Sequence, residues 1–282
     1  MTTDDLLAVH ELRSGDGRAA SVPIVLLHGF PFDSRMWSGV AARLPGGREV
    51  LAIDLPGLGA SIAGVAVADR LNEAGVRSAS PPALETSADA VWLTLQRRGV
   101  ESAIIAGLSM GGYVAMAIVD RHPELVRGLA LLDTRSGADA ADVATNRLRV
   151  ADAVIREGGV DAVRPMATTL LGETSRAVRA DLVERLAGWI DDQRPDGIAW
   201  SQRAMAARPD RSGVLRRYGG PSVVLVGDED VVTPVEAART MHEDLADSTL
   251  LVVPRAGHMT AVENPEPVAD ALADLVARAD RR

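Results

Sequence analysis

Six short runs of apolar residues recur along the chain, with helix-like stretches between them. The runs are VPIVLLHG (22–29), REVLAIDLPG (48–57), ESAIIAGLS (101–109), VRGLALLDT (126–134), PSVVLVGDED (221–230) and STLLVVPRAGH (248–258). Their apolar residues are continuous rather than alternating, which is typical of strands that helices cover on both faces. This rhythm predicts an α/β fold with a doubly wound, mostly parallel sheet. The segment LLAVHEL (6–12) alternates better and is expected to form an antiparallel edge strand before the parallel block.

Helix signals fall in the gaps between these runs. Thr86 or Ser87 is expected to cap the helix SADAVWLTLQRR, and Gly99 stands where a left-handed C-terminal cap would end it. A long connection between residues 61 and 85 exceeds the usual loop length and is expected to hold a short helix near residues 66–74.

A long segment without strand-like runs separates the fourth and fifth parallel runs. Residues 136–215 have helical periodicity, interrupted at Gly158–Gly159, Gly172, Arg194–Pro195 and Arg208–Pro209. The segment is interpreted as a helical cap inserted into one α/β core, which residues 1–135 and 216–282 form together.

Composition narrows the classes of function. The chain is 47% hydrophobic and 24% charged, as in globular proteins, and its low aromatic content of 3% favours an aliphatic substrate pocket. A net charge of -9 without basic runs argues against nucleic acid as a partner. The absence of Cys excludes disulfides and thiol catalysis, and no apolar run approaches the roughly 20 residues of a membrane span. The acidic N-terminus lacks the features of a secretory signal, so a cytoplasmic protein is expected.

The sharpest chemical signal is Gly107-Leu108-Ser109-Met110-Gly111-Gly112, between an apolar run and a helix-like run. The G-x-S-x-G spacing is typical of a tight strand-to-helix turn that needs glycine beside the serine and exposes the serine hydroxyl. The backbone N–H of Met110, at the start of the helix, would then face the oxygen that becomes negative during acyl transfer. Ser109 is therefore the candidate nucleophile.

A serine nucleophile needs a base, and five histidines are available. His258 follows the last apolar run, which places it at the carboxyl edge of the sheet, where Ser109 also lies. His10 is expected on the edge strand, His122 at the end of the helix after Ser109, and His242 exposed on a helix. His258 is the predicted base.

The loop after the first buried run has a different role. His28, in Leu27-His28-Gly29-Phe30-Pro31, is expected to hold this loop by hydrogen bonds rather than to accept a proton. The backbone N–H of Phe30 is predicted to join that of Met110 as the second oxyanion donor.

The third member of a triad is a carboxylate between the serine and the histidine in chain order, at the end of a strand. Asp133, Asp228 and Asp230 all qualify. Asp230 is favoured because it projects from the loop before Thr233-Pro234, whereas Asp228 lies closer to the end of the strand. Asp133 is the main rival.

The motifs HGF, DLPGLGAS, GLSMGG, GDEDVVTP and AGH together resemble the motif series of the α/β-hydrolase superfamily, over nearly the whole chain. The resemblance implies an acyl-enzyme mechanism in which Ser109 attacks a carbonyl, His258 shuttles the proton and Asp230 orients the imidazole, without a metal or cofactor. The segments LLDTRSGADA, REGGVDAV and GHMTAVENPEPV look like those of bacterial 3-oxoadipate enol-lactonases and related small esterases. The stretch after Asp54 is longer than in that subfamily.

The expected substrate is thus a small carboxylic ester or lactone. Trp37, Arg147, Met166 and Trp189 are candidate substrate contacts, although packing or an ion pair also explains each of them. Perhydrolysis with halide oxidation, C–C bond hydrolysis and a non-catalytic small-molecule-binding protein stay open as alternatives. A homo-oligomer also stays open.

Overall fold

The computed structural model describes residues 6–15, 22–77 and 82–282, and within them seven strands form one sheet. The strands are β1 (Val9–Arg13), β2 (Ile24–Leu27), β3 (Val50–Ile53), β4 (Ala103–Leu108), β5 (Val126–Leu132), β6 (Ser222–Gly227) and β7 (Ser248–Val253). Their order across the sheet is β1-β3-β2-β4-β5-β6-β7. β1 runs antiparallel to β3, and the other neighbouring pairs are parallel. The predicted α/β fold, including its antiparallel edge strand, is confirmed.

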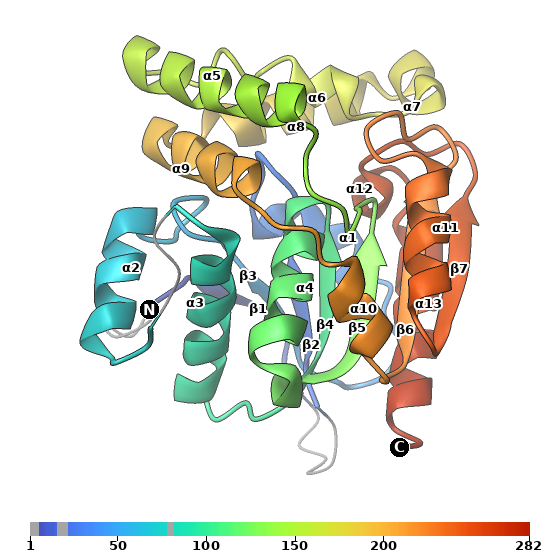
Figure 1. Cartoon of the computed structure of the whole chain (residues 1–282). Helices are drawn as coiled ribbons and strands as arrows, with labels where there is room; N and C mark the ends of the chain where they lie inside the picture. Colours follow the sequence, from blue (N-terminus) through green and yellow to red (C-terminus); the bar gives the residue numbers. More distant parts are fainter. Residues whose placement is uncertain (1–5, 16–21, 78–81) are drawn as a thin grey trace.

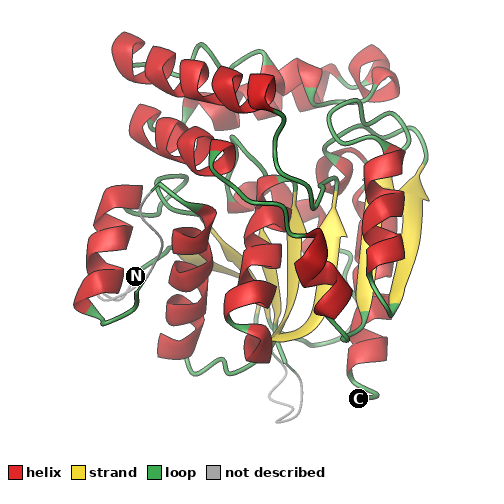
Figure 2. Cartoon of the chain, viewed as in Figure 1, coloured by secondary structure: helices red, strands yellow, loops and turns green. Residues whose placement is uncertain are grey.

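Helices cover both faces of the sheet (Figures 1 and 2). On one face, α3 (Leu84–Arg97), α4 (Met110–Arg121), α10 (Ser212–Arg217) and α11 (Val235–Asp244) pack side by side, and α2 (Gly64–Glu73) contacts α3. On the other face, α13 (Pro265–Ala279) lies against β5 and β6 and contacts α1 (Ser38–Ala41) and α12 (Thr260–Glu263). Short 3-10 helices, η1 (Ser34–Trp37) and η2 (Pro123–Leu125), complete this core. Burial by both layers explains why β2, β3 and β4 consist of apolar residues throughout.

The ends of α3 correct one prediction and confirm another. The helix begins at Leu84 with Ala83 as its N-cap, so neither Thr86 nor Ser87 is the cap. Both polar side chains are instead buried in the first turn, because the earlier start also buries Leu84 in the core. Gly99 adopts φ +75°, the left-handed conformation expected just after the helix.

The connection between β3 and α3 contains the short helix expected near residues 66–74. It is α2, at Gly64–Glu73, and Val67 and Leu71 on its inner face are buried in the core. Residues 78–81 of the connection lie outside the described part of the chain, as do residues 1–5 of the acidic N-terminus.

Five further helices between β5 and β6 lie over the carboxyl ends of the strands (Figure 1). These cap helices are α5 (Ala141–Glu157), α6 (Met166–Thr169), α7 (Glu173–Val178), α8 (Ala180–Asp191) and α9 (Pro195–Ala206). α5 packs along α9, and α8 contacts α6 and α7. α10 follows them but packs on α4 and α11 of the core. The division into core and cap remains an interpretation.

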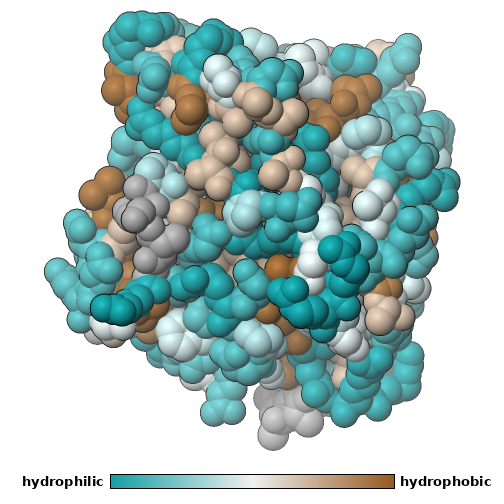
Figure 3. Space-filling view, viewed as in Figure 1, coloured by the Kyte–Doolittle hydropathy of each residue, from teal (hydrophilic) through white to brown (hydrophobic). Residues whose placement is uncertain are grey.

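The face of the molecule in Figure 3 is mainly hydrophilic, and its hydrophobic residues form small, separate groups. Among the described residues, no helix has both the length and the apolar character that a bilayer crossing requires.

Candidate active site

Ser109 occupies a strained turn between β4 and α4. Its backbone has φ 52° and ψ -111°, a region that side-chain-bearing residues rarely adopt. The flanking glycines are required sterically: a Cβ on Gly107 would lie 2.2 Å from the carbonyl oxygen of Gly111, and one on Gly111 would lie 2.1 Å from that of Leu27. The turn leaves Ser109 partly exposed while its neighbours Leu108 and Met110 are buried. The local geometry is that of the predicted nucleophile turn.

Three side chains from distant segments form a continuous hydrogen-bonded chain. Nε2 of His258 lies 2.8 Å from Oγ of Ser109, and Nδ1 of His258 lies 2.8 Å from Oδ2 of Asp230. Because the carboxylate can only accept, Nδ1 carries the proton and Nε2 is left to accept from the serine hydroxyl. This tautomer is the one in which histidine can remove a proton from serine.

Asp230 is held in place by the loop that follows β6. Its Oδ1 accepts the N–H groups of Val232 and Thr233, and its Oδ2 accepts the Thr233 hydroxyl at 2.6 Å. Burial acts to raise the pKa of Asp230, but the hydrogen bonds from His258 and Thr233 outweigh it and hold that pKa below its usual range. Asp230 therefore stays charged and directed at the imidazole.

The rival carboxylates have other partners. Asp133 accepts the N–H of Gly227, the N–H of Thr260 and the Thr260 hydroxyl, so it joins the end of β5 to β6 and α12. Complete burial, with Asp230 nearby, raises the pKa of Asp133 to about 7. Asp228 accepts the N–H of Arg255 at 2.7 Å. Of the three, Asp230 is the one hydrogen-bonded to His258.

The loop that carries His258 is anchored by a carboxylate that the sequence analysis did not single out. Glu263 accepts the backbone N–H groups of Gly257 and Met259 and, from the segment between α6 and α7, that of Gly172. The N–H of His258 itself donates to the carbonyl of Leu170 at 2.9 Å. The imidazole is thus positioned jointly by the core and by the cap segment. The sequence offers only a weak signal for Glu263, its position five residues after the histidine.

The two predicted oxyanion donors are available in the described part of the chain. The N–H groups of Phe30 and Met110 have no acceptor among these residues. Gly29 approaches the nucleophile turn closely, since a Cβ there would lie 3.0 Å from the Leu108 side chain and 3.5 Å from that of Ser109. Phe30, next in the chain, therefore belongs to the loop that faces Ser109.

His28 stabilises this loop by hydrogen bonds. It is completely buried, its Nε2 accepts the N–H of Leu55 at 2.9 Å, and its Nδ1 donates to the carbonyl of Gly29 at 3.0 Å. Burial lowers the pKa of His28, so the ring is neutral and fills the hydrogen-bonding role expected of it.

Two of the four residues predicted to contact substrate interact with other protein groups instead. Trp37 is fully buried in the hydrophobic core. Nε of Arg147 lies 2.6 Å from Oδ2 of Asp139, and its Nη1 lies 3.2 Å from Oε1 of Gln202. A core position and an ion pair thus account for both residues without a ligand.

Met166 and Trp189, on cap helices, are only partly buried. Met166 packs against the core cluster. The Trp189 ring meets Phe32 edge-on, with the centroids 6.4 Å apart, and the Arg35 guanidinium lies 5.7 Å from its centroid. These contacts hold Trp189 against Phe32 and Arg35, and part of its side chain remains exposed.

The sequence analysis did not single out Arg135, an arginine near the nucleophile turn. Arg135 follows Thr134, whose hydroxyl donates to the carbonyl of Ser109 at 2.8 Å. The buried Nε of Arg135 has no hydrogen-bond partner among the described residues, and its guanidinium forms no ion pair with them. The sequence signal was the position of an arginine three residues after β5, a strand that ends at the same edge of the sheet as Ser109.

The other histidines lie apart from this chain of hydrogen bonds. His10, on β1 as expected, lies 2.8 Å from Asp54. His122 ends α4 as expected, and its ring stacks on Trp92 and bonds to Asp89. His242 is on a helix but is partly buried, because Nδ1 bonds to the Ser248 hydroxyl at 2.6 Å. No group of His, Asp and Glu residues in the described ranges has the arrangement of a metal site.

Comparisons with known proteins agree with this architecture. A family model described as the alpha/beta hydrolase fold matches residues 22–265. The structure of a thermophilic esterase from Thermogutta terrifontis, with malate bound, superimposes with a TM-score of 0.85 at 30% identity, covering 97% of this chain and 94% of that one. The enol-lactonase from Burkholderia xenovorans LB400 superimposes with a TM-score of 0.80 at 21% identity, covering 96% and 97%, and at that identity shows the fold alone.

Curated relatives give a similar result. A pimeloyl-[acyl-carrier protein] methyl ester esterase from Neisseria meningitidis is 26% identical over 274 residues, which cover 90% of this chain and 93% of the relative. The chain spans only 62% of the length of another relative, an acetyltransferase component of the acetoin cleaving system of Pseudomonas putida, at 26% identity. The family match over most of the chain, together with the seven-stranded sheet and its nucleophile turn, shows that the protein belongs to the α/β-hydrolase fold family.

Proposed function

We propose that this hydrolase cleaves carboxylic esters or lactones through an acyl-enzyme on Ser109. The observation that carries the proposal is the hydrogen-bonded chain from Oγ of Ser109 through His258 to Asp230, with both distances at 2.8 Å. A serine hydroxyl is a poor nucleophile unless a base removes its proton, and this arrangement supplies the base in the required tautomer.

The reaction then follows from the geometry. As Oγ of Ser109 attacks the carbonyl carbon, its proton passes to Nε2 of His258, and Asp230 stabilises the resulting imidazolium. The N–H groups of Phe30 and Met110 donate to the carbonyl oxygen as it becomes negative, a contribution on the order of 10²–10³ in rate for each donor. His258 returns the proton to the leaving alkoxide oxygen as the ester C–O bond breaks. In a lactone that hydroxyl stays attached to the acyl chain.

Water completes the cycle. His258 takes a proton from a water molecule that attacks the acyl carbon, and the second tetrahedral intermediate collapses to release the carboxylic acid and return the proton to Ser109. The partly exposed Ser109 beside the buried His258 and Asp230 suits this sequence, since substrate and water reach the nucleophile while the charge pair stays shielded.

The substrate is proposed to be a small ester or lactone with an aliphatic acyl part. The esterases among the relatives support ester cleavage, and the chain's few aromatic residues support an aliphatic site. Among the four predicted contacts, Trp189 and Met166 are proposed to border the substrate, because Trp37 and Arg147 are engaged by protein.

The test combines labelling with turnover. A fluorophosphonate is expected to modify Ser109 in the wild type and nothing in Ser109→Ala, and a panel of acyl esters and lactones of graded length should give turnover that the same substitution abolishes. A folded protein that neither reacts with the probe nor turns over any substrate would instead support a non-catalytic binding protein. Turnover of lactones but not of open-chain esters would narrow the activity to lactonase.

A further inference from the structure

The two outermost strands of the sheet differ in how well they resist pairing with another chain. β1, with the sequence VHELR, carries His10, Glu11 and Arg13, and its register with β3 shifts between Glu11 and Arg13. Charged side chains and irregular register are features by which proteins protect exposed sheet edges. β1 is therefore a protected edge.

β7, at the opposite edge, has none of these features. Its sequence is STLLVV, without charge or proline, and its six residues pair with β6 in unbroken parallel register. Five of the six are exposed or only partly buried, and in the described part of the chain no strand pairs with its outer edge. An uncharged, regular and apolar edge of this length is a template for pairing with a further strand.

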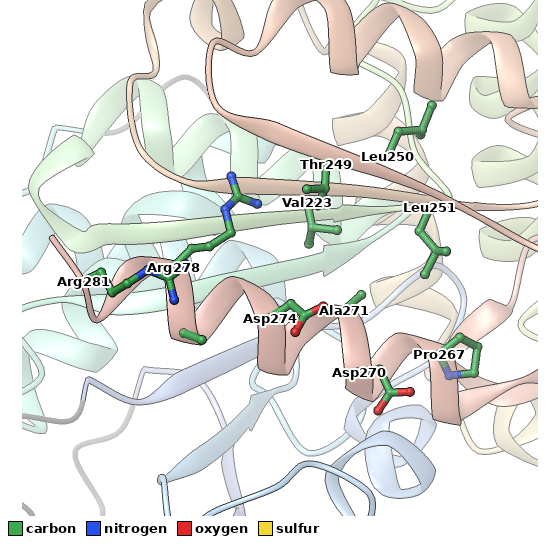
Figure 4. A pocket seen from close by; sticks show the side chains of 11 residues that line it. Val223, Thr249, Leu250, Leu251, Pro267, Asp270, Ala271, Asp274, Arg278 and Arg281 are labelled. Carbon is green, nitrogen blue, oxygen red and sulfur yellow. The ribbon is translucent and has the colours of Figure 1, made fainter.

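A hollow accompanies this edge, between β7 and α13, with a volume of about 570 Å³ (Figure 4). Val223, Leu251 and Ala271 give it an apolar surface. Figure 4 shows Leu251 pointing from β7 toward α13. A partner at this edge would thus meet both unpaired backbone groups and apolar side chains.

Charges along the hollow are segregated. Asp270 and Asp274 lie toward one end, and Arg278 and Arg281 lie toward the other (Figure 4). Arg278 is tied to Ser222 and Asp247, whereas Asp270, Asp274 and Arg281 are exposed and form no ion pair with the described residues. Along α13, this side of the edge is therefore acidic toward the start of the helix and basic toward its end.

This order of charges is complementary to itself. A two-fold axis perpendicular to the sheet would pair β7 antiparallel with its own copy and place the two α13 helices antiparallel on the same face. The acidic end of each hollow would then face the basic end of the other. We propose that a second copy of this chain covers the β7 edge, forming a two-fold homodimer whose sheet continues across β7 and whose α13 charges pair between subunits.

The oligomeric state of the full chain tests the proposal. Sedimentation equilibrium over a dilution series is expected to give twice the 29.6 kDa of the chain, with dissociation on dilution. Leu251→Lys places a charge at the edge and should raise the dimer dissociation constant at least tenfold. Val9→Lys is its matched control, because Val9 is also a partly buried residue of an outermost strand, and this variant should leave the dimer intact.

A charge exchange tests the symmetry without touching the core. Asp274→Arg and Arg281→Asp, both at exposed positions, should each weaken the dimer at low salt, while the double variant should restore it. Circular dichroism would verify that each variant is folded. Ser109→Ala should lose turnover but keep the dimer, so failure of the proposed reaction and failure of the proposed dimer are separate results.

Three results would overturn the dimer. In the first, the wild type is monomeric at every concentration. In the second, Val9→Lys dissociates the dimer and the β7 and α13 variants leave it intact. In the third, the double variant dimerises as weakly as the single variants.

Discussion

At the residue scale, hydrogen-bond partners distinguish the two buried carboxylates that could belong to the triad. Asp133 and Asp230 both follow parallel strands at the same edge of the sheet, and both are buried. Asp230 accepts Nδ1–H of His258, whereas Asp133 accepts from Gly227 and Thr260. The two carboxylates therefore have separate roles despite their proximity.

Asp230→Asn should lower kcat by about 10⁴, because an amide in place of the carboxylate disfavours the tautomer in which Nε2 is free to accept the proton of Ser109. Asp133→Asn should retain far more turnover, since its hydrogen bonds act on the backbone rather than on the imidazole. Steady-state measurement of kcat for the two variants on one ester compares them. The opposite ranking would show that Asp133 is the acid of the triad.

Gly111→Ala should destabilise the fold. The added methyl group would lie 2.1 Å from the carbonyl oxygen of Leu27, a backbone atom of β2 that cannot rotate away, and overpacking of this kind costs about 1–3 kcal/mol or more. Gly188→Ala is the control, because Gly188 is exposed on α8 with open space around it. Alanine there should raise the free energy of unfolding by about 0.5–1 kcal/mol. Denaturant unfolding measures both. Equal stability of the two variants would show that the nucleophile turn tolerates a side chain.

At the scale of elements, the loop carrying His258 depends on α12 and on the segment between α6 and α7. Glu263, at the end of α12, accepts three backbone N–H groups, two from the loop itself and one from Gly172. A second hydrogen bond, from the N–H of His258 to the carbonyl of Leu170 at 2.9 Å, also joins the loop to this segment. The segment between α6 and α7 therefore helps to place His258, the proposed base.

Glu263→Gln should release this loop, because the amide offers one neutral acceptor oxygen where the carboxylate offers two charged ones. Hydrogen bonds to charged groups contribute about 1.5–3 kcal/mol each, so we expect a loss of at least that size in unfolding free energy together with a lower kcat. Glu243→Gln, on the exposed surface of α11, is the control and should change neither quantity. A Glu263→Gln variant with wild-type kcat would show that the loop holds His258 without this anchor.

At the scale of the whole molecule, the burial of ionisable groups makes stability depend on pH. Burial, with Asp230 nearby, raises the pKa of Asp133 to about 7 from 3.8. A carboxyl that binds its proton more tightly in the folded chain stabilises the fold at low pH, and this contribution is lost as the pH rises through the folded pKa. Asp230 has a lowered pKa and the opposite sign, since its contribution is present above its unfolded pKa and is lost in acid.

Unfolding free energy should therefore contain a part that declines between about pH 4 and pH 7 and belongs to Asp133. Denaturant unfolding at pH 5 and pH 8 should show a smaller decline in Asp133→Asn than in the wild type, even if this variant is less stable at both values. The same decline in both proteins would show that Asp133 does not titrate in this range.

Much of the architecture was predictable because it depends on local pattern. Continuous apolar runs are typical of strands buried on both faces, and all six became parallel strands of one sheet, although β7 at its edge is mostly only partly buried. The glycines around Ser109 indicated a tight turn before any contact was known, since the sterics of that turn are local. The start of α3 was misplaced because the burial of Leu84, a tertiary contact, outweighed the capping preference of Thr86 and Ser87.

Chain order and residue type by themselves determined the fold class, the nucleophile turn and the short list of bases and acids, because periodicity and backbone sterics act over a few residues. Tertiary structure alone decided which acid meets His258, which arginine is already engaged and which sheet edge is unprotected. Those outcomes depend on contacts between segments that are separate in the chain, such as the 2.8 Å between His258 and Asp230, 28 positions apart, and the 3.2 Å between Arg147 and Gln202, 55 positions apart. Only the packed fold brings such segments within hydrogen-bonding distance.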